Sequence, residues 1–283
     1  MLPFYHIVTD DIPLHVKHLY KPRTIKNFKE DIHFLLAHYE PISLQQLLDI
    51  KRSGQPVNKN YFHLTFDDGL SEFYSIAAPI LKERNIPATV FLNSDFIDNE
   101  LLFYRFKASI LYDKLKDNSL LSIIYENKDQ LDELANDNNI DFSIYLNDKK
   151  PYLTSDQIKE LIKQGFTFGA HSKDHPLYNQ LTLEEQLVQT KESILSVTRK
   201  FDLDYRVFSF PFTDDMVSNK FFEEIASFTD MTFGSAGLKE DMAKNHFQRV
   251  AMETNKTGKD IIKSEYLYCL AKIKAGKNKI IRQ

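Results

Sequence analysis

The chain has 283 residues, of which 42% are hydrophobic and 27% are charged, the balance of an ordinary globular protein. This length fits one large α/β domain or two small ones. Acidic residues (40) outnumber basic residues (36) and give a formal net charge of -4, which argues against a surface that binds a nucleic-acid backbone. The single cysteine, Cys269, allows no internal disulfide, so the fold does not depend on an oxidising compartment.

Residues 1–8 contain no basic segment, no apolar segment of about 7–15 residues and no small-residue cleavage site, so they do not resemble a secretory signal. Charged and amide residues interrupt every apolar stretch before it reaches the roughly 18 residues that a membrane-spanning helix requires. We therefore expect a cytoplasmic protein with no membrane span, although a secreted chain whose signal has been removed would show the same pattern.

Short apolar runs alternate with amphipathic segments, which is the pattern of βα units around a parallel sheet. The first hundred residues predict strands at 2–8, 61–66 and 88–93, and helices at about 26–38, 42–50 and 73–83. The second strand leads directly into Asp67, Asp68 and Gly69, so two carboxylates are expected at a strand end, where active-site residues of parallel sheets lie.

The pattern changes between residues 97 and 150, where charged and amide residues predominate and apolar residues are scattered. Glycine and proline are too scarce in this segment for a flexible linker. We interpret it as an insertion that forms one helix and then a second, polar helix over one rim of the main domain. The whole chain, residues 1–283, is then predicted to be a single α/β domain with an insertion at about 97–150.

Two capping-box sequences, Thr154-Ser-Asp-Gln157 and Thr182-Leu-Glu-Glu185, mark helix starts after the insertion. This half of the chain predicts helices at 155–164, 182–200, 221–228 and 259–272, and strands at 166–170, 206–210, 231–233 and 247–252. The first of these strands leads into His171 and His175, and the second leads into Pro211 and Phe212.

Together, these strand ends predict a metal site. Two imidazoles and one carboxylate suit a borderline divalent ion such as zinc and leave positions open for water and substrate. A bound ion makes water more acidic, and the second carboxylate is then free to act as a base. Taken alone, the Asp-Asp-Gly sequence could be only a tight turn and the His-x3-His spacing only a solvated loop, but their joint placement after strands favours the metal site.

The motifs Thr65-Phe-Asp-Asp-Gly69 and His171-Ser-Lys-Asp-His-Pro176 resemble those of the NodB-type polysaccharide deacetylases, carbohydrate esterase family four. The resemblance covers most of the chain outside the insertion. It implies a distorted (β/α) barrel, a zinc-like divalent ion, and hydrolysis of an N-acetyl or O-acetyl group on a sugar; zinc is the first expectation for the ion and cobalt is the alternative. Carried over by position, Asp67 is the base and the ion is held by Asp68, His171 and His175. The backbone N–H of Phe212 corresponds to the donor that stabilises the oxyanion.

Two family features are missing from the sequence. The family's Arg-x-Pro-aromatic motif reads Ser209-Phe-Pro-Phe212, so the arginine that would orient the base is absent. We predict that Arg249, in preference to Arg206, supplies a guanidinium to Asp67 from another strand end. The family's late histidine, which would protonate the leaving group, also has no clear counterpart, and two isolated histidines, at positions 6 and 246, are the candidates.

The predicted function is that of a metal-dependent hydrolase that removes an acetyl group from an acetylated sugar or polysaccharide, with N-deacetylation favoured. One alternative removes a formyl or other small acyl group from a sugar intermediate by the same chemistry. Another, motivated by the two missing features, is a non-catalytic relative that binds a glycan. The expected partner is an acetylated carbohydrate and not a nucleic acid, the sequence predicts no oligomeric state, and Tyr5, Tyr178 and Phe212 are the aromatic residues expected near the site.

Overall fold

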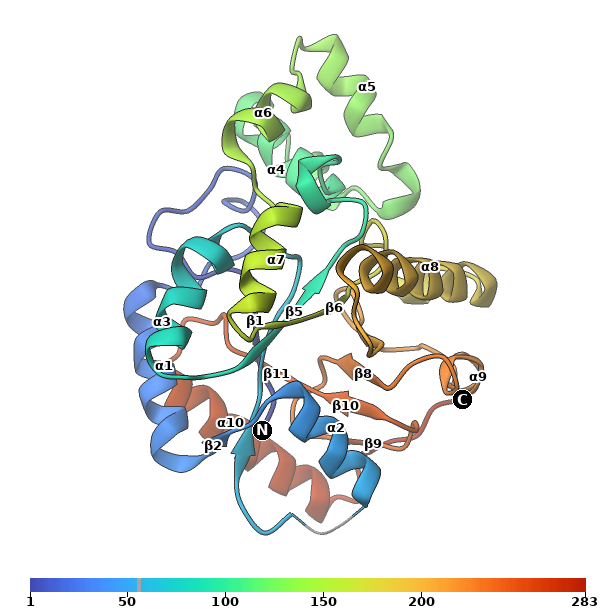
Figure 1. Cartoon of the computed structure of the whole chain (residues 1–283). Coiled ribbons are helices and arrows are strands. Elements are labelled where there is room, and N and C mark those ends of the chain that lie inside the picture. The colour runs from blue at the N-terminus through green and yellow to red at the C-terminus, as the bar shows by residue number, and fades with distance from the viewer. Residues whose placement is uncertain (55–56) are drawn as a thin grey trace.

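The computed structural model describes residues 1–54 and 57–283 and contains a central sheet of eight parallel strands (Figure 1). The strand order across the sheet is β10-β8-β7-β6-β5-β4-β1-β11. In chain order the eight strands are β1 (Pro3–Tyr5), β4 (Leu64–Phe66), β5 (Ala88–Leu92), β6 (Thr167–Ala170), β7 (Val207–Ser209), β8 (Met231–Gly234), β10 (His246–Gln248) and β11 (Val250–Ala251). From β1 to β10, strands that follow one another in this list are neighbours in the sheet, and the last strand, β11, lies beside the first, β1. This is the order of a barrel built from βα units.

The two edge strands of this sheet, β10 and β11, are joined by the single residue Arg249. β10 pairs with β8 at one edge, and β11 pairs with β1 at the other, so the sheet curls into a nearly closed barrel whose two edges meet at Arg249. The prediction of one strand at 247–252 is therefore wrong. The segment was interpreted as one strand, but its two halves bond to opposite edges of the sheet.

Helices surround the barrel, and the structure confirms both predicted capping boxes. The helices outside the insertion are α1 (Ile25–His38), α2 (Leu44–Ser53), α3 (Ala78–Glu83), α7 (Ser155–Lys163), α8 (Leu183–Phe201), α9 (Asn219–Ile225) and α10 (Gly258–Lys274). Two further pairs of short strands lie outside the barrel: β2 (Glu40–Pro41) with β3 (Tyr61–Phe62), and β9 (Glu240–Asp241) with β12 (Lys279–Ile280).

Three further predicted elements differ from those observed. The strand predicted at 2–8 ends at Tyr5, because the next residues turn away and the N–H of Ile7 donates to a side chain, Glu253. The strand predicted at 61–66 is two strands in different sheets, separated by a buried histidine, His63. The helix predicted at 73–83 begins as a π-helix at Phe73–Ala77, since Pro79 lacks the N–H that a continuous α-helix would require.

Residues 97–150 lie outside the barrel and form several short helices, more than the two expected for this segment. Their bounds are α4 (Tyr104–Leu115), α5 (Gln130–Asp137) and α6 (Phe142–Lys149), with 3₁₀ turns at η2 (Ile97–Asn99), η3 (Asn118–Ser122) and η4 (Tyr125–Asn127). These helices gather at one end of the molecule, at the top of Figure 1. They pack around an apolar cluster that is separate from the main core and includes Phe103, Phe106 and Leu131. Within the described ranges, no helix is long and apolar enough to cross a membrane.

Candidate metal centre and active site

The candidate site lies where three parallel strands end. Asp67 and Asp68 follow β4, His171 follows β6, and Phe212 lies beyond the end of β7. The backbone φ angle is positive at Asp68 (70°), His175 (64°) and Phe212 (55°), a region that residues with side chains seldom occupy. Strained backbone of this kind is concentrated at functional sites, where the surrounding structure holds it in place.

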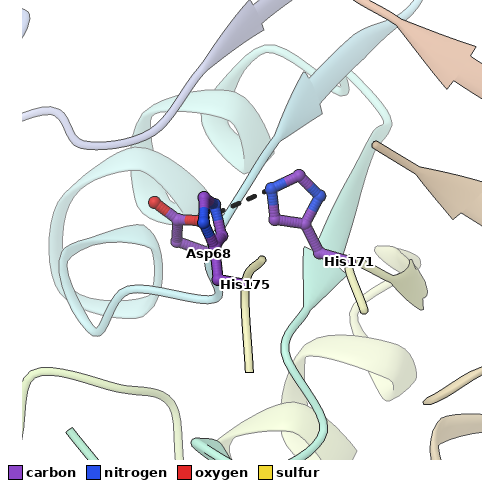
Figure 2. A group of neighbouring side chains, drawn as sticks. All are labelled: Asp68, His171 and His175. Atoms are coloured by element: carbon purple, nitrogen blue, oxygen red, sulfur yellow. Dashed lines mark ion pairs between the residues drawn. The ribbon is translucent and has the colours of Figure 1, made fainter. Parts of the chain in front are cut away.

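Asp68, His171 and His175 converge on one point, and all three side chains are buried (Figure 2). The Oδ1 atom of Asp68 lies 3.1 Å from Nε2 of His175 and 3.5 Å from Nε2 of His171. The three donor atoms lie within 4.8 Å of one another, a spacing at which one ion could contact them all. The sequence therefore predicted a set of residues that the fold does bring together.

The protonation states of His171 and Asp68 also suit a metal ion. Burial lowers the pKa of His171 to about 4, so its ring is neutral at pH 7. Its Nδ1–H donates to the carbonyl oxygen of Ser209 at 2.8 Å, which leaves the lone pair of Nε2 facing Asp68. Burial alone would raise the pKa of Asp68, but His175 and the other nearby imidazoles hold it well below its usual range. Oδ1 of Asp68 has no hydrogen-bond partner in the part of the chain described, as expected of an oxygen available to a cation.

Asn93 and Ser172 fix the loop that carries the two histidines. The side-chain amide of Asn93 donates to the carbonyl oxygen of His171 at 2.5 Å and to the hydroxyl of Ser172 at 3.3 Å. The Ser172 hydroxyl in turn accepts the backbone N–H of His175 at 3.0 Å. Neither residue was singled out in the sequence, because only the fold brings the end of β5 beside this loop.

Arg249 lies against Asp67, as the sequence predicted. Its two Nη atoms donate to the two carboxylate oxygens of Asp67 at 2.8 and 2.7 Å, and both side chains are buried. The remaining donors reach Thr65 Oγ1 at 2.9 Å, Ser209 Oγ at 2.6 Å and the Gly234 carbonyl at 3.1 Å. Ser209 stands where the family motif has its arginine. It therefore serves as an acceptor for Arg249, which lies at the seam of the barrel, where the two edges of the sheet meet.

Arg249 also sets the charge of Asp67. Burial raises the pKa of this carboxyl group, but the adjacent Arg249 guanidinium, together with the rings of His171 and His6, outweighs burial, so the pKa is lowered overall. Asp67 is thus ionised at neutral pH and can accept a proton. The other candidate, Arg206, lies away from the site, with its guanidinium over the ring of Phe228 and its backbone N–H bonded to Asp230.

The structure distinguishes the two candidate histidines. His6 is at the site, because its Nδ1 contacts Oε2 of Glu253 and its pKa responds to both Asp67 and Asp68. Burial lowers the pKa of His6, but the Glu253 carboxylate and the two aspartates raise it to about 9. His6 is therefore protonated at pH 7, and its side chain is 29% exposed. His246 instead belongs to a separate buried cluster and contacts Asp214 at 3.0 Å.

Two phenylalanines form an apolar wall beside His175. The ring centroid of Phe103, from the insertion, lies 4.4 Å from that of His175, and the ring centroid of Phe212 lies 4.5 Å from that of His175. No acceptor for the backbone N–H of Phe212 occurs among the described residues, so this donor is available to a bound molecule. Phe103 was missed in the sequence because nothing in its local pattern places the start of α4 beside a histidine 72 residues later.

Two of the three aromatic residues expected near the site belong to the core. Tyr5 is fully buried, and its hydroxyl donates to Asp31. Tyr178 is also fully buried, and its hydroxyl bonds to Thr190. Only Phe212, which is 45% exposed, lies at the site.

Comparison with known families agrees with this geometry. Residues 54–233, more than half of the chain, match the family described as polysaccharide deacetylase. The matched range includes both aspartates and both histidines of the site, whereas His6 and Arg249 lie outside it. The chain therefore belongs to the polysaccharide deacetylase family, a family of hydrolases.

Solved structures show the same fold at low sequence identity. The Streptococcus pyogenes deacetylase PplD, determined in complex with acetate, is 15% identical, with a TM-score of 0.63 over 93% of this chain and 96% of that chain. IcaB from Ammonifex degensii is 15% identical, with a TM-score of 0.61 over 93% and 95%. A de-N-acetylase from Aggregatibacter actinomycetemcomitans is 16% identical, with a TM-score of 0.62 over 93% and 98%. The predicted distorted (β/α) barrel is thereby confirmed.

A curated relative matches over a short segment. The poly-beta-1,6-N-acetyl-D-glucosamine N-deacetylase of Escherichia coli K12 is 40% identical over 50 residues, which are 18% of this chain and 7% of the relative. This chain is thus matched over only a small part of that relative's length.

Proposed function

We propose that this protein is a metal-dependent deacetylase that hydrolyses the N-acetyl group of an acetylated amino sugar within an oligosaccharide or polysaccharide. The observation that carries the proposal is the convergence of Asp68, His171 and His175 beside a carboxylate, Asp67, that is held and charged by Arg249. Its support includes family membership and the acetylated glucosamine polymer named for the E. coli relative.

Asp68, His171 and His175 would hold the ion, with zinc as the first expectation and cobalt as the alternative. A divalent cation bound there would polarise the acyl carbonyl and acidify a water molecule. Asp67 accepts a proton from the attacking water, because Arg249 keeps its carboxylate ionised and fixed in orientation. The water oxygen then bonds to the acyl carbon.

The remaining roles belong to Phe212 and His6. The free N–H of Phe212 donates to the carbonyl oxygen as negative charge develops there. The carbon–nitrogen bond breaks, its electron pair stays on nitrogen, and His6 supplies the proton that the departing amine requires. Glu253 contacts Nδ1 of His6, so the donated proton comes from Nε2. The products are acetate and the free amino sugar.

Measurement of acetate and free amine together tests the proposal. The zinc-loaded or cobalt-loaded protein should release both in equal amounts from acetylated chitooligosaccharides, β-1,6-linked N-acetylglucosamine oligomers or peptidoglycan fragments. Asp68→Ala should contain little metal and release neither product, because one of three ligands is lost. Asp49→Asn, a change at an exposed carboxylate on α2, is the matched control and should behave like the parent.

Acetate without amine, released from acetylated xylan alone, would indicate an O-deacetylase and contradict the N-acetyl assignment. Failure of the metal-loaded parent to release acetate from any of these substrates would overturn the proposal. The Arg249–Asp67 contact argues against the glycan-binding alternative, since the missing arginine that motivated that alternative is replaced.

A further inference from the structure

A second buried cluster of ionisable residues lies outside the candidate active site. The carboxylates of Asp214 and Asp241 and the ring of His246 place three donor atoms within 4.8 Å of one another, a set that could hold a cation. The guanidinium of Arg282 lies among these groups, and its side chain is 4% exposed. Arg282 therefore supplies the positive charge that this acidic cluster requires.

Arg282 uses its donors on two parts of the chain. Nε donates to Oδ1 of Asp241 at 3.1 Å, and Nη2 donates to Oδ2 of Asp241 at 2.6 Å and to Oδ2 of Asp214. Nη1 donates to the backbone carbonyl oxygens of Asp214 at 2.8 Å and Val217 at 3.2 Å. The guanidinium thus joins the segment that follows β12 to the loop between β7 and α9.

That loop carries Phe212, two residues before Asp214. Its backbone is strained at Phe212, with a φ of 55°, and the side chains of Phe212 and Met216 are 45% and 78% exposed, so neither side chain is packed in the core. The anchored Asp214 accepts the N–H of Ser235 at 3.2 Å, and the Ser235 hydroxyl donates to the Phe212 carbonyl at 3.1 Å. A chain of hydrogen bonds thus runs from Arg282 through Asp214 and Ser235 to the carbonyl group of Phe212.

Gly234 connects this cluster to the active site. A Cβ atom at this position would lie 2.3 Å from Oδ1 of Asp214, so only glycine allows the aspartate to approach. The Gly234 carbonyl oxygen accepts Nε of Arg249, the residue that orients Asp67. The loop that presents the Phe212 N–H therefore packs against Gly234, the residue whose carbonyl oxygen also holds Arg249 beside Asp67.

We propose that Arg282 is a positioning residue that holds the 211–217 loop so that the Phe212 N–H faces the reacting carbonyl. The inference rests on the proposed function for its catalytic consequence, but the anchoring of the loop does not. Asp241, His246 and Arg282 all lie beyond residue 233, where the family match ends, so that match assigns them no role.

Two variants and a small-molecule rescue test this role. Arg282→Ala should lower kcat roughly tenfold to a hundredfold, the scale of a displaced oxyanion donor, with KM and zinc content near those of the parent. Amide hydrogen exchange in residues 211–217, read by mass spectrometry, should become faster. Added guanidinium ion should restore both kcat and protection in Arg282→Ala, because the cluster would again hold a planar cation.

Arg282→Lys retains the charge but not the planar set of donors, so it should fold and still show lowered kcat and faster exchange. Arg52→Ala removes an exposed arginine paired with Asp230 and is the matched control. Parent-like kcat and exchange in Arg282→Lys, or no response of Arg282→Ala to guanidinium, would overturn the inference. Hydrogen exchange needs no substrate, so an inactive parent would refute the proposed function while the anchoring of the loop is still decided.

Discussion

Asp67 and Arg249 form a bidentate ion pair that is almost completely removed from water. The guanidinium has a partner for every N–H group, so the arginine cannot turn away without leaving buried donors unpaired. Asp67 is consequently held with one orientation and one charge. Its neighbour Asp68 accepts no hydrogen bond at Oδ1 within the described residues. The two carboxylates therefore differ: Asp67 is suited to accept a proton, and Asp68 is suited to bind a cation.

This separation predicts the behaviour of Asp67→Asn. The amide cannot accept a proton as the carboxylate does, so turnover should fall on the order of a hundredfold or more, the scale of a general base. Zinc content, measured by mass spectrometry of the metal, should stay at the parent level because the three ligands are intact. Loss of zinc together with activity would instead identify Asp67 as a ligand.

Glu253 predicts how His6 titrates. In the metal-free protein, NMR should place the pKa of the His6 ring near 9, since the Glu253 carboxylate, together with Asp67 and Asp68, outweighs the effect of burial. Glu253→Gln should lower this pKa and move the alkaline limb of the activity profile to lower pH, because the protonated form of His6 is then lost earlier. Glu240→Gln, an exposed carboxylate next to Lys279, is the control and should change neither.

The same shift affects stability. The pKa of His6 is raised from 6.5 to about 9, so its interaction contributes stability that is fully present below pH 6.5 and is lost as the pH rises through about 9. Glu253→Gln should therefore reduce the difference in unfolding free energy between pH 6 and pH 10. An unchanged difference would show that the Glu253–His6 pair does not govern this titration.

Among the secondary-structure elements, the insertion contributes one ring to the site. Phe103 at the start of α4 packs on His175, and its backbone N–H donates to the Tyr152 hydroxyl oxygen at 3.0 Å. The helices of residues 97–150 thus do more than cover a rim of the barrel. They supply one of the two apolar surfaces beside the proposed metal ligand.

Phe103→Ala should change the preference for acyl groups. Removal of the ring enlarges the space beside His175, so the ratio of kcat/KM for a propionyl over an acetyl substrate should rise by roughly tenfold, the scale of one methylene in an apolar pocket. Phe142→Ala makes a comparable cavity elsewhere in the insertion and should leave the ratio unchanged. An equal rise in both variants would attribute the effect to general loosening.

Local sequence signals predicted most elements and four of the site residues. The capping boxes marked the starts of α7 and α8, since capping depends on residues three positions apart. Motif spacing also placed the two aspartates and two histidines at strand ends. The strand predicted at 247–252 was wrong, because the local sequence does not report which edge of a sheet a strand joins.

Contacts between distant segments were harder to predict. Arg249 could be named only because a resemblance showed that an arginine was missing, and the choice between His6 and His246 needed the position of Glu253. The wall formed by Phe103 and the anchoring by Arg282 left no local signal. Each depends on how chain segments far apart in sequence pack, which periodicity does not encode.

For the whole molecule, Arg249 closes the barrel and completes the site at once. Arg249→Ala should leave the Asp67 charge buried and unpaired, which costs about 3–5 kcal/mol of unfolding free energy. The pKa of Asp67 should rise, so the acidic limb of the activity profile should move to higher pH while zinc content is retained.

Urea denaturation measures the loss of stability. Arg52→Ala, which breaks an ion pair whose arginine side chain is 57% exposed, should cost no more than about 1 kcal/mol. Equal losses in the two variants would mean that the buried pair at the seam contributes no more than a surface contact.

The seam at Arg249 also bears on when a newly made chain becomes competent. Arg249 is synthesised 182 residues after Asp67, so both aspartates and both histidines leave the ribosome well before the partner of the base. β11 cannot pair with β1 until the segment beyond Arg249 has also emerged, and such long-range pairing forms late. A nascent chain is therefore expected to bring the proposed metal ligands together around a proposed base that still lacks its arginine, and the onset of turnover is expected to coincide with barrel closure.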